Sequence, residues 1–218
     1  MAKLQVGLNQ YVTSIGGKEM LSKVENIVSK SEMLFMERGV TINREITQNK
    51  ENHFLVKVNS IQTGEIVRGF DGSTHWEKNK SSIRELNNED KISFLNEFAF
   101  MRFADWEKNL IGYTYLGIDT LEGRKFHCLA VKTIYGVDEK WYFNTIDFLL
   151  EYTTESIEMT QGNITVITKL EDYKEVDGIK HAFSRSIKMG DRNRKITFNS
   201  IMHNQNIDEK LFEKPFNE

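Results

Sequence analysis

Short runs of alternating apolar and polar residues, separated by turns that contain glycine, fill the second half of the chain. The runs 164–173, 181–189 and 196–203 are joined by turns at Asp177-Gly178 and Gly190-Asp191. Alternation puts successive side chains on opposite faces of a strand, and connections this short join antiparallel neighbours. The spacing therefore predicts an up-and-down antiparallel sheet.

The same pattern covers most of the remaining sequence. Alternating segments run from residue 27 to about residue 80, and others follow Gly112. The strands expected after Gly112 are 113–118, 125–135, 140–143, 148–154, 164–173, 181–189 and 196–203. Together they predict an α+β fold with a strongly curved antiparallel sheet of about eleven strands, an unclosed β-barrel. Since 218 residues suit one such domain, we expect residues 1–218 to form a single half-barrel domain.

Three helices are expected to cover the concave face of this sheet. The first has apolar residues at helical spacing from Leu4 to Ile15 and ends at Gly16-Gly17, and a second, shorter helix follows. The third is expected over 89–106, after an asparagine cap. Its apolar positions extend far beyond the single stripe that a helix usually turns toward a core.

This third helix has two interpretations that the residues leave open. It fills the interior as a core helix, or it is a lid over an apolar cavity of several hundred Å³, the size of typical ligand sites. The candidate ligand-binding residues of the second interpretation are Phe94, Leu95, Phe98, Met101, Phe103, Phe126, Cys128, Ala130, Phe143, Ile164 and Val166. The face that each strand turns inward depends on register, because a shift of one residue exchanges the two faces.

Residues that would support catalysis or metal binding are scattered. Cys128 is the only cysteine, and the adjacent His127 is expected to point to the opposite face of the strand. The five histidines form no HxH, HxxxH or HExxH spacing, and no GxSxG, GxGxxG or Walker pattern is present. We therefore expect no metal, no cofactor and no catalytic residues. An enzyme, a hydrolase of unknown type, ranks last among the functions.

Charge and hydropathy argue against a nucleic-acid partner and against a membrane-spanning segment. The net charge is −3, and Lys and Arg are spread among acidic residues, which argues against nucleic acid. No run of about 18 apolar residues exists, so no integral membrane segment is expected. Residues 1–7 lack the apolar centre of a signal peptide. This leaves open a cytoplasmic location and an exported protein whose signal has been removed.

Several short motifs between Tyr11 and Pro215 have an order and spacing found together in one superfamily. The motifs are Tyr11-Val12-Thr13-Ser14-Ile15-Gly16-Gly17, Phe70-Asp71-Gly72 with Trp76, Gly117 with Glu122-Gly123-Arg124, and Trp141-Tyr142-Phe143-Asn144 followed by Phe148-Leu149-Leu150. In these the chain resembles the LolA/LolB-like superfamily of lipoprotein and lipid carriers, in its Bacteroidetes type. Two positions depart from the pattern: Asn144 stands where Asp is common, and His181 where Pro is frequent.

The resemblance implies a half-barrel that binds and transfers an apolar ligand in the periplasm without catalysis. The implied ligands are lipoprotein acyl chains or lipid, and the implied partner is a membrane-bound donor or acceptor protein. The alternative function is a structural or interaction module of the same fold with a filled interior.

Overall fold

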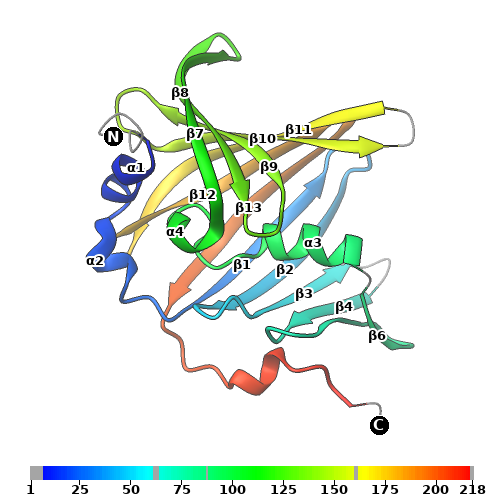
Figure 1. Cartoon of the computed structure of the whole chain (residues 1–218). Coiled ribbons are helices and arrows are strands. Elements are labelled where there is room, and N and C mark those ends of the chain that lie inside the picture. The colour runs from blue at the N-terminus through cyan, green and yellow to red at the C-terminus, as the bar shows by residue number, and fades with distance from the viewer. Residues whose placement is uncertain (1–6, 61–63, 87, 160–161, 217–218) are drawn as a thin grey trace.

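The computed structural model describes residues 7–60, 64–86, 88–159 and 162–216. Within these residues, one sheet of thirteen strands curves around a few short helices (Figure 1). The strands are β1 Asn26–Phe35, β2 Val40–Asn49, β3 Phe54–Ser60, β4 Gly64–Phe70, β5 His75–Lys78, β6 Ile83–Glu85, β7 Leu110–Leu121, β8 Arg124–Thr133, β9 Asp138–Asn144, β10 Leu150–Met159, β11 Gly162–Val176, β12 Ile179–Met189 and β13 Arg192–His203. The helices are α1 Leu8–Ser14, α2 Gly17–Leu21, α3 Asn88–Glu97, α4 Trp106–Asn109 and the 3₁₀ helix η1 Glu209–Phe212.

The strand order divides the sheet into two meanders. β1 to β6 run outward from the middle of the sheet to one edge, and β7 to β13 run inward from the other edge. β1 and β13 meet in the middle, where Ile27 pairs with His203 and Met33 with Ile196. Every pairing between the described strands is antiparallel, which confirms the predicted up-and-down sheet. The sheet is also unclosed, as expected, because β6 and β7 are its two edges.

The expected number of strands, about eleven, is lower than the thirteen that the described residues form. β5 has four residues and β6 has three. Strands this short contain too few alternations to stand out from the surrounding turns. The helices are also fewer and shorter than expected: α3, the longest in the described part of the chain, has ten residues.

The prediction of one long helix over 89–106 is wrong for the second half of that range. α3 ends at Glu97, an irregular stretch follows in which Met101 has a φ of 45°, and α4 begins only at Trp106. Positive φ is unfavourable for a residue with a side chain, so the surrounding contacts must hold this turn in place.

The break in the helix sends three aromatic side chains to three parts of the core. Phe98 packs against β2, β3 and β4, Phe100 packs beside β1, and Phe103 packs against β8 and β9. All three are buried. A continuous helix turns one apolar stripe toward one surface, so the chain leaves helical geometry to bury this wider set.

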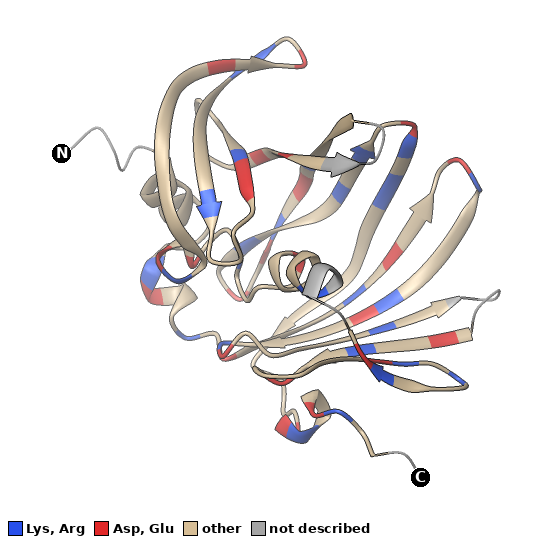
Figure 2. Ribbon diagram, turned by 45° about the vertical axis from the view of Figure 1, so that its right-hand side comes forward, with Lys and Arg blue, Asp and Glu red and all other residues tan. Residues whose placement is uncertain are grey.

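Residues 88–109, called the crossing segment below, connect the two edges of the sheet. β6 lies at one edge and β7 at the other, so the chain between them has to pass over a face of the sheet. Figures 1 and 2 show α3 and α4 lying across the concave face. α1 packs on the same face, since Leu8 and Tyr11 share a buried cluster with Phe103. Charged residues of both signs are spread over the sheet, while β12 and β13 carry only basic ones (Figure 2).

Gly69 provides a test of the packing at the β4–β5 hairpin. A Cβ at this position would overlap the ring of Trp76, which is 2% exposed and whose Nε1 donates to the carbonyl of Phe212 at 2.8 Å. We expect Gly69→Ala to lower the free energy of unfolding by about 1–3 kcal/mol, because Trp76 cannot shift without losing this hydrogen bond. The matched control is Gly112→Ala on β7, where a Cβ meets no atom within 4 Å. Equal effects of both changes in urea unfolding would contradict this explanation.

Candidate binding site

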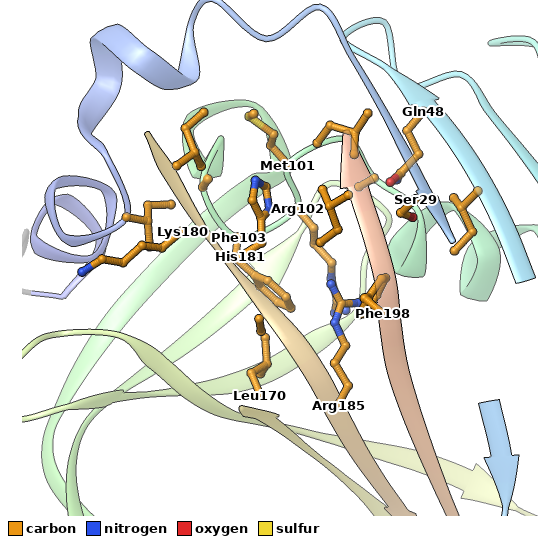
Figure 3. Close-up of a pocket in the computed structure, with 18 of the residues that line it drawn as sticks. Ser29, Gln48, Met101, Arg102, Phe103, Leu170, Lys180, His181, Arg185 and Phe198 are labelled. Carbon is orange, nitrogen blue, oxygen red and sulfur yellow. The ribbon is translucent and has the colours of Figure 1, made fainter. Parts of the chain in front are cut away.

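A cavity of about 120 Å³ lies between the crossing segment and the middle strands of the sheet (Figure 3). It is bordered by α1, α2, β1, β2, β11, β12 and β13. Apolar side chains from these elements and from the crossing segment line it, among them Ile15, Ile27, Ile46, Met101, Phe103 and Ile201. Such a lining is typical of sites for apolar ligands. The volume is smaller than the several hundred Å³ expected from the sequence.

Glu139 ties the crossing segment to one half of the sheet. Its side chain is only 1% exposed, and it forms an ion pair with Arg102. The carboxylate also accepts hydrogen bonds from Asn96 Nδ2 at 2.8 Å and from Trp141 Nε1 at 2.7 Å. A buried carboxylate needs this full set of partners to offset the loss of hydration. Glu139 therefore fixes the crossing segment to β9.

Two amide side chains tie the crossing segment to the other half of the sheet. Gln48 Nε2 on β2 donates to the carbonyl of Phe98 at 2.5 Å. The backbone N–H of Phe100 donates to Asn52 Oδ1 at 2.7 Å. These bonds satisfy backbone groups that the broken helix leaves without intrahelical partners. The crossing segment is thus held from both sides over the cavity.

Positive charge predominates among the described residues that line the cavity. Arg44, Arg102 and Arg185 contribute cations, whereas Glu97 contributes the one carboxylate, and the exposed side chain of Lys180 points away from the cavity (Figure 3). Arg44 is 7% exposed, and its guanidinium lies 3.6 Å from Glu97. Burial lowers the pKa of both Arg44 and Arg185, since the charged form loses hydration.

His181, which lines the cavity, contacts a second histidine, His203. His181 Nε2 lies 2.9 Å from His203 Nε2, and His203 Nδ1 lies 3.3 Å from a carboxylate oxygen of Asp177. Burial, followed by the charges of His203 and Arg185, lowers the pKa of His181 to about 4. His181 is therefore neutral at pH 7 and adds no charge to the cavity wall. A proline at position 181, as is frequent in the superfamily pattern, could not make this contact.

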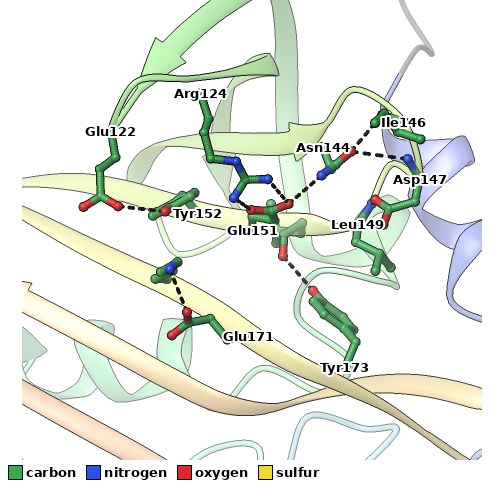
Figure 4. A network of polar contacts seen from close by, with 12 residues as sticks. Glu122, Arg124, Asn144, Ile146, Asp147, Leu149, Glu151, Tyr152, Glu171 and Tyr173 are labelled. Atoms are coloured by element: carbon green, nitrogen blue, oxygen red, sulfur yellow. Dashed lines mark hydrogen bonds and ion pairs between the residues drawn. The ribbon is translucent and has the colours of Figure 1, made fainter.

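Asn144, the other departure from the pattern, makes a contact that an aspartate could not make (Figure 4). Asn144 Nδ2 donates to Glu151 Oε1 at 2.6 Å, while its Oδ1 accepts from the backbone N–H of Ile146 at 2.8 Å. Glu151 also accepts hydrogen bonds from Arg124 at 2.6 and 2.9 Å. A carboxylate at position 144 would repel Glu151, so the amide suits this network.

The candidate residues of the expected lid are divided between the cavity and the core. Phe98, Met101 and Phe103 line the cavity. Phe94 and Leu95 pack beside it, in a cluster with strands β2 to β4, and are not among its lining residues.

The candidate strand residues lie outside the cavity lining. Phe143 is buried under α1, where its ring centroid is 5.6 Å from that of Tyr11. Phe126 and Cys128 belong to a separate cluster with two tyrosines, and alternation places Ala130 on the same face of β8. Ile164 and Val166 on β11 are also absent from the lining. Whether any of the eleven candidates contacts a ligand stays a prediction.

The residues that the sequence interpretation missed are mainly charged. Arg44 lies between Ile42 and Ile46 in the alternating pattern of β2, and Arg185 lies between Phe183 and Ile187 in that of β12. A charged residue in the apolar phase of a strand points toward the interior, and this signal could have identified both. The contact between His181 and His203 joins residues far apart in sequence, and no local spacing indicates it.

Cys128 is completely buried, and burial raises the pKa of its thiol. The thiolate is the reactive form, so both effects slow its reactions. We expect Ellman's reagent to modify almost no thiol in the native protein and one per chain in urea, in line with the single cysteine. Rapid labelling of the native protein would show that the packing around Cys128 opens readily.

The described residues contain no group of three or more His, Cys, Asp or Glu side chains that could hold a metal ion. None of the helices in the described part of the chain has the length and apolar character needed to cross a bilayer.

Two solved structures resemble this fold over nearly its whole length. A DUF1329 family protein from Desulfovibrio piger superposes with a TM-score of 0.66 and 12% identity, over 96% of this chain and 97% of the other. A LolA superfamily protein from Nitrosomonas europaea gives a TM-score of 0.66 and 10% identity, over 97% of both chains. No protein-family model and no curated protein matches the sequence. At these identities the likeness concerns the fold alone.

Proposed function

We propose that this chain, whose fold is LolA-like, binds and transfers an apolar ligand without catalysing a reaction. The proposed ligands are the acyl chains of lipoproteins or free lipid, and the proposed location is the periplasm. The observation that carries this proposal is the apolar cavity on the concave face, beneath a segment that spans the sheet from edge to edge. A membrane-bound donor or acceptor protein is the partner that such transfer requires.

The size of the cavity specifies how binding would occur. A volume of about 120 Å³ holds only a few water molecules, which is too little for a whole acyl chain. The crossing segment must therefore move outward on binding. Each CH₂ that leaves water contributes about 0.8 kcal/mol, so a chain of ordinary length can offset the packing that this movement disrupts. The cavity described above is then the closed form of the site.

The small volume also favours the second candidate, a structural or interaction module with a filled interior. In that case Phe98 and Phe103 complete the core and the crossing segment stays in place. The two candidates differ in whether these side chains exchange protein neighbours for a ligand.

Ligand extraction and one matched pair of variants test the proposal. Lipid extracted from the purified protein is identified by mass spectrometry, and the affinity for a fluorescent fatty acid is then measured. Phe103 lines the cavity, whereas Phe126 is buried in the cluster outside the cavity lining. We expect Phe103→Ala and Phe126→Ala each to cost about 3–5 kcal/mol of stability, and only Phe103→Ala to weaken binding. No extracted lipid and no fatty-acid binding would favour the filled module.

A further inference from the structure

We infer that the ligand of this cavity is an amphiphile with an anionic group, a carboxylate or a phosphate, and that Arg185 binds this group together with Arg44. This inference rests on the proposed function and names the class of ligand within it. It depends on how the buried arginines are partnered.

Arg185 is a deeply placed cation without a carboxylate partner. It lies on β12, where it pairs with Ile196 on one side and Leu170 on the other, and it lines the cavity. Its Nε is buried and has no hydrogen-bond partner among the described residues, and no described carboxylate lies within ion-pair distance of its guanidinium. The guanidinium instead lies over the ring of Phe198, 5.2 Å from the ring centroid.

Arg44 and Arg102 differ in how fully they are neutralised. Arg102 is occupied by the ion pair with Glu139. The only carboxylate paired with Arg44 in the described part of the chain is that of Glu97, 3.6 Å away, and the Glu97 side chain is 43% exposed. The buried Nε of Arg44 has no hydrogen-bond partner among the described residues. Figure 3 shows Arg102 and Arg185 extending into the same space. Arg102 Nε also has no hydrogen-bond partner in the described part of the chain, but Glu139 neutralises the charge of Arg102. The cations of the cavity that lack a close counter-charge are therefore Arg185 and, in part, Arg44.

An anionic group would supply the partner that these arginines lack. A buried guanidinium without a counter-charge is strongly disfavoured, and carboxylates and phosphates bind it through two parallel hydrogen bonds. The lining beside the arginines is apolar, with Phe98, Met101 and Phe103 on the crossing segment. An anionic group at Arg185 would thus place an attached hydrocarbon chain against these three side chains.

The test compares charged ligands with neutral ligands of the same chain length by isothermal titration calorimetry. Oleic acid is paired with methyl oleate, and 1-oleoyl lysophosphatidic acid with monoolein. The variants are Arg185→Gln, Arg185→Lys and the control Arg38→Gln, which removes the same charge from an exposed turn. We expect the wild type to bind at least one anion about 10- to 100-fold more tightly than its neutral partner. Arg185→Gln should abolish this difference, Arg185→Lys should restore part of it, and Arg38→Gln should leave it unchanged.

The outcomes show whether this inference fails alone or together with the proposed function. A difference confined to one pair of ligands supports the inference and identifies the anion as carboxylate or phosphate. Equal binding of charged and neutral ligands, or equal losses for both in Arg185→Gln, would overturn the inference and leave the carrier function standing. If none of the four ligands binds, the proposed function falls together with it.

Discussion

Replacing Glu139 with glutamine is expected to lower the free energy of unfolding by about 3–5 kcal/mol, the cost of leaving one partner of a buried ion pair without its counter-charge. The Arg102 side chain is only 19% exposed, so water hydrates the charge that remains only in part. The neutral amide also weakens the hydrogen bonds from Asn96 and Trp141. Chemical unfolding in urea measures the effect, and hydrogen exchange should show faster exchange in residues 98–105.

The control is Glu85→Gln, which removes an ion pair with Lys214 whose two side chains are 62% and 38% exposed. Exposed pairs contribute about 0–1 kcal/mol, so this variant should stay near wild-type stability. If Glu139→Gln behaved like Glu85→Gln, the crossing segment would be held by its apolar contacts alone.

Acidification from pH 6.5 to pH 4 is expected to remove about 3 kcal/mol of stability through His181, whose pKa is about 4 in the folded protein and 6.5 ordinarily. The sign follows from proton uptake. Below pH 6.5 the unfolded chain binds a proton at this residue while the folded protein does not, so stability is complete above pH 6.5 and declines toward pH 4. Burial is the main cause, followed by the charges of His203 and Arg185.

His181→Gln isolates this contribution from those of the carboxylates. Carboxylates that titrate in the same window are common to both proteins, so they cancel in the difference between the wild type and the variant. His203, which contacts His181, titrates together with it, so the difference reports the pair. That difference should change by about 3 kcal/mol between pH 6.5 and pH 4. A difference independent of pH would mean that His181 is hydrated in the folded protein.

The sequence predicts the sheet better than the crossing segment, for a physical reason. Strand alternation and turn glycines are local features, so the hairpin around Gly178, with its φ of 79°, follows from neighbouring residues. The broken helix depends on three separate clusters that receive Phe98, Phe100 and Phe103. These clusters form only in the folded protein, and a helical pattern cannot indicate where the chain must leave the helix.

The face of β8 that turns toward the concave side of the sheet cannot be predicted from alternation either. Phe126 and Cys128 are buried on one face of this strand, and Leu129 and Val131 are buried on the other. A strand that is apolar on both faces gives no sign of which face turns inward. The arginines are different, because Arg44 and Arg185 interrupt the apolar phase of their strands and were identifiable in principle.

The two open edges of the sheet bear on whether copies of this chain associate. An unpaired edge strand offers backbone groups to which another chain can add. β6 offers only three residues, among them Arg84 and Glu85. β7 is twelve residues long and exposes Leu116 and Ile118, but its register shifts twice, next to Gly112 and Gly117. Such bulges twist a strand away from the flat geometry that intermolecular pairing needs. Both edges are therefore poor templates for aggregation, even though the barrel never closes.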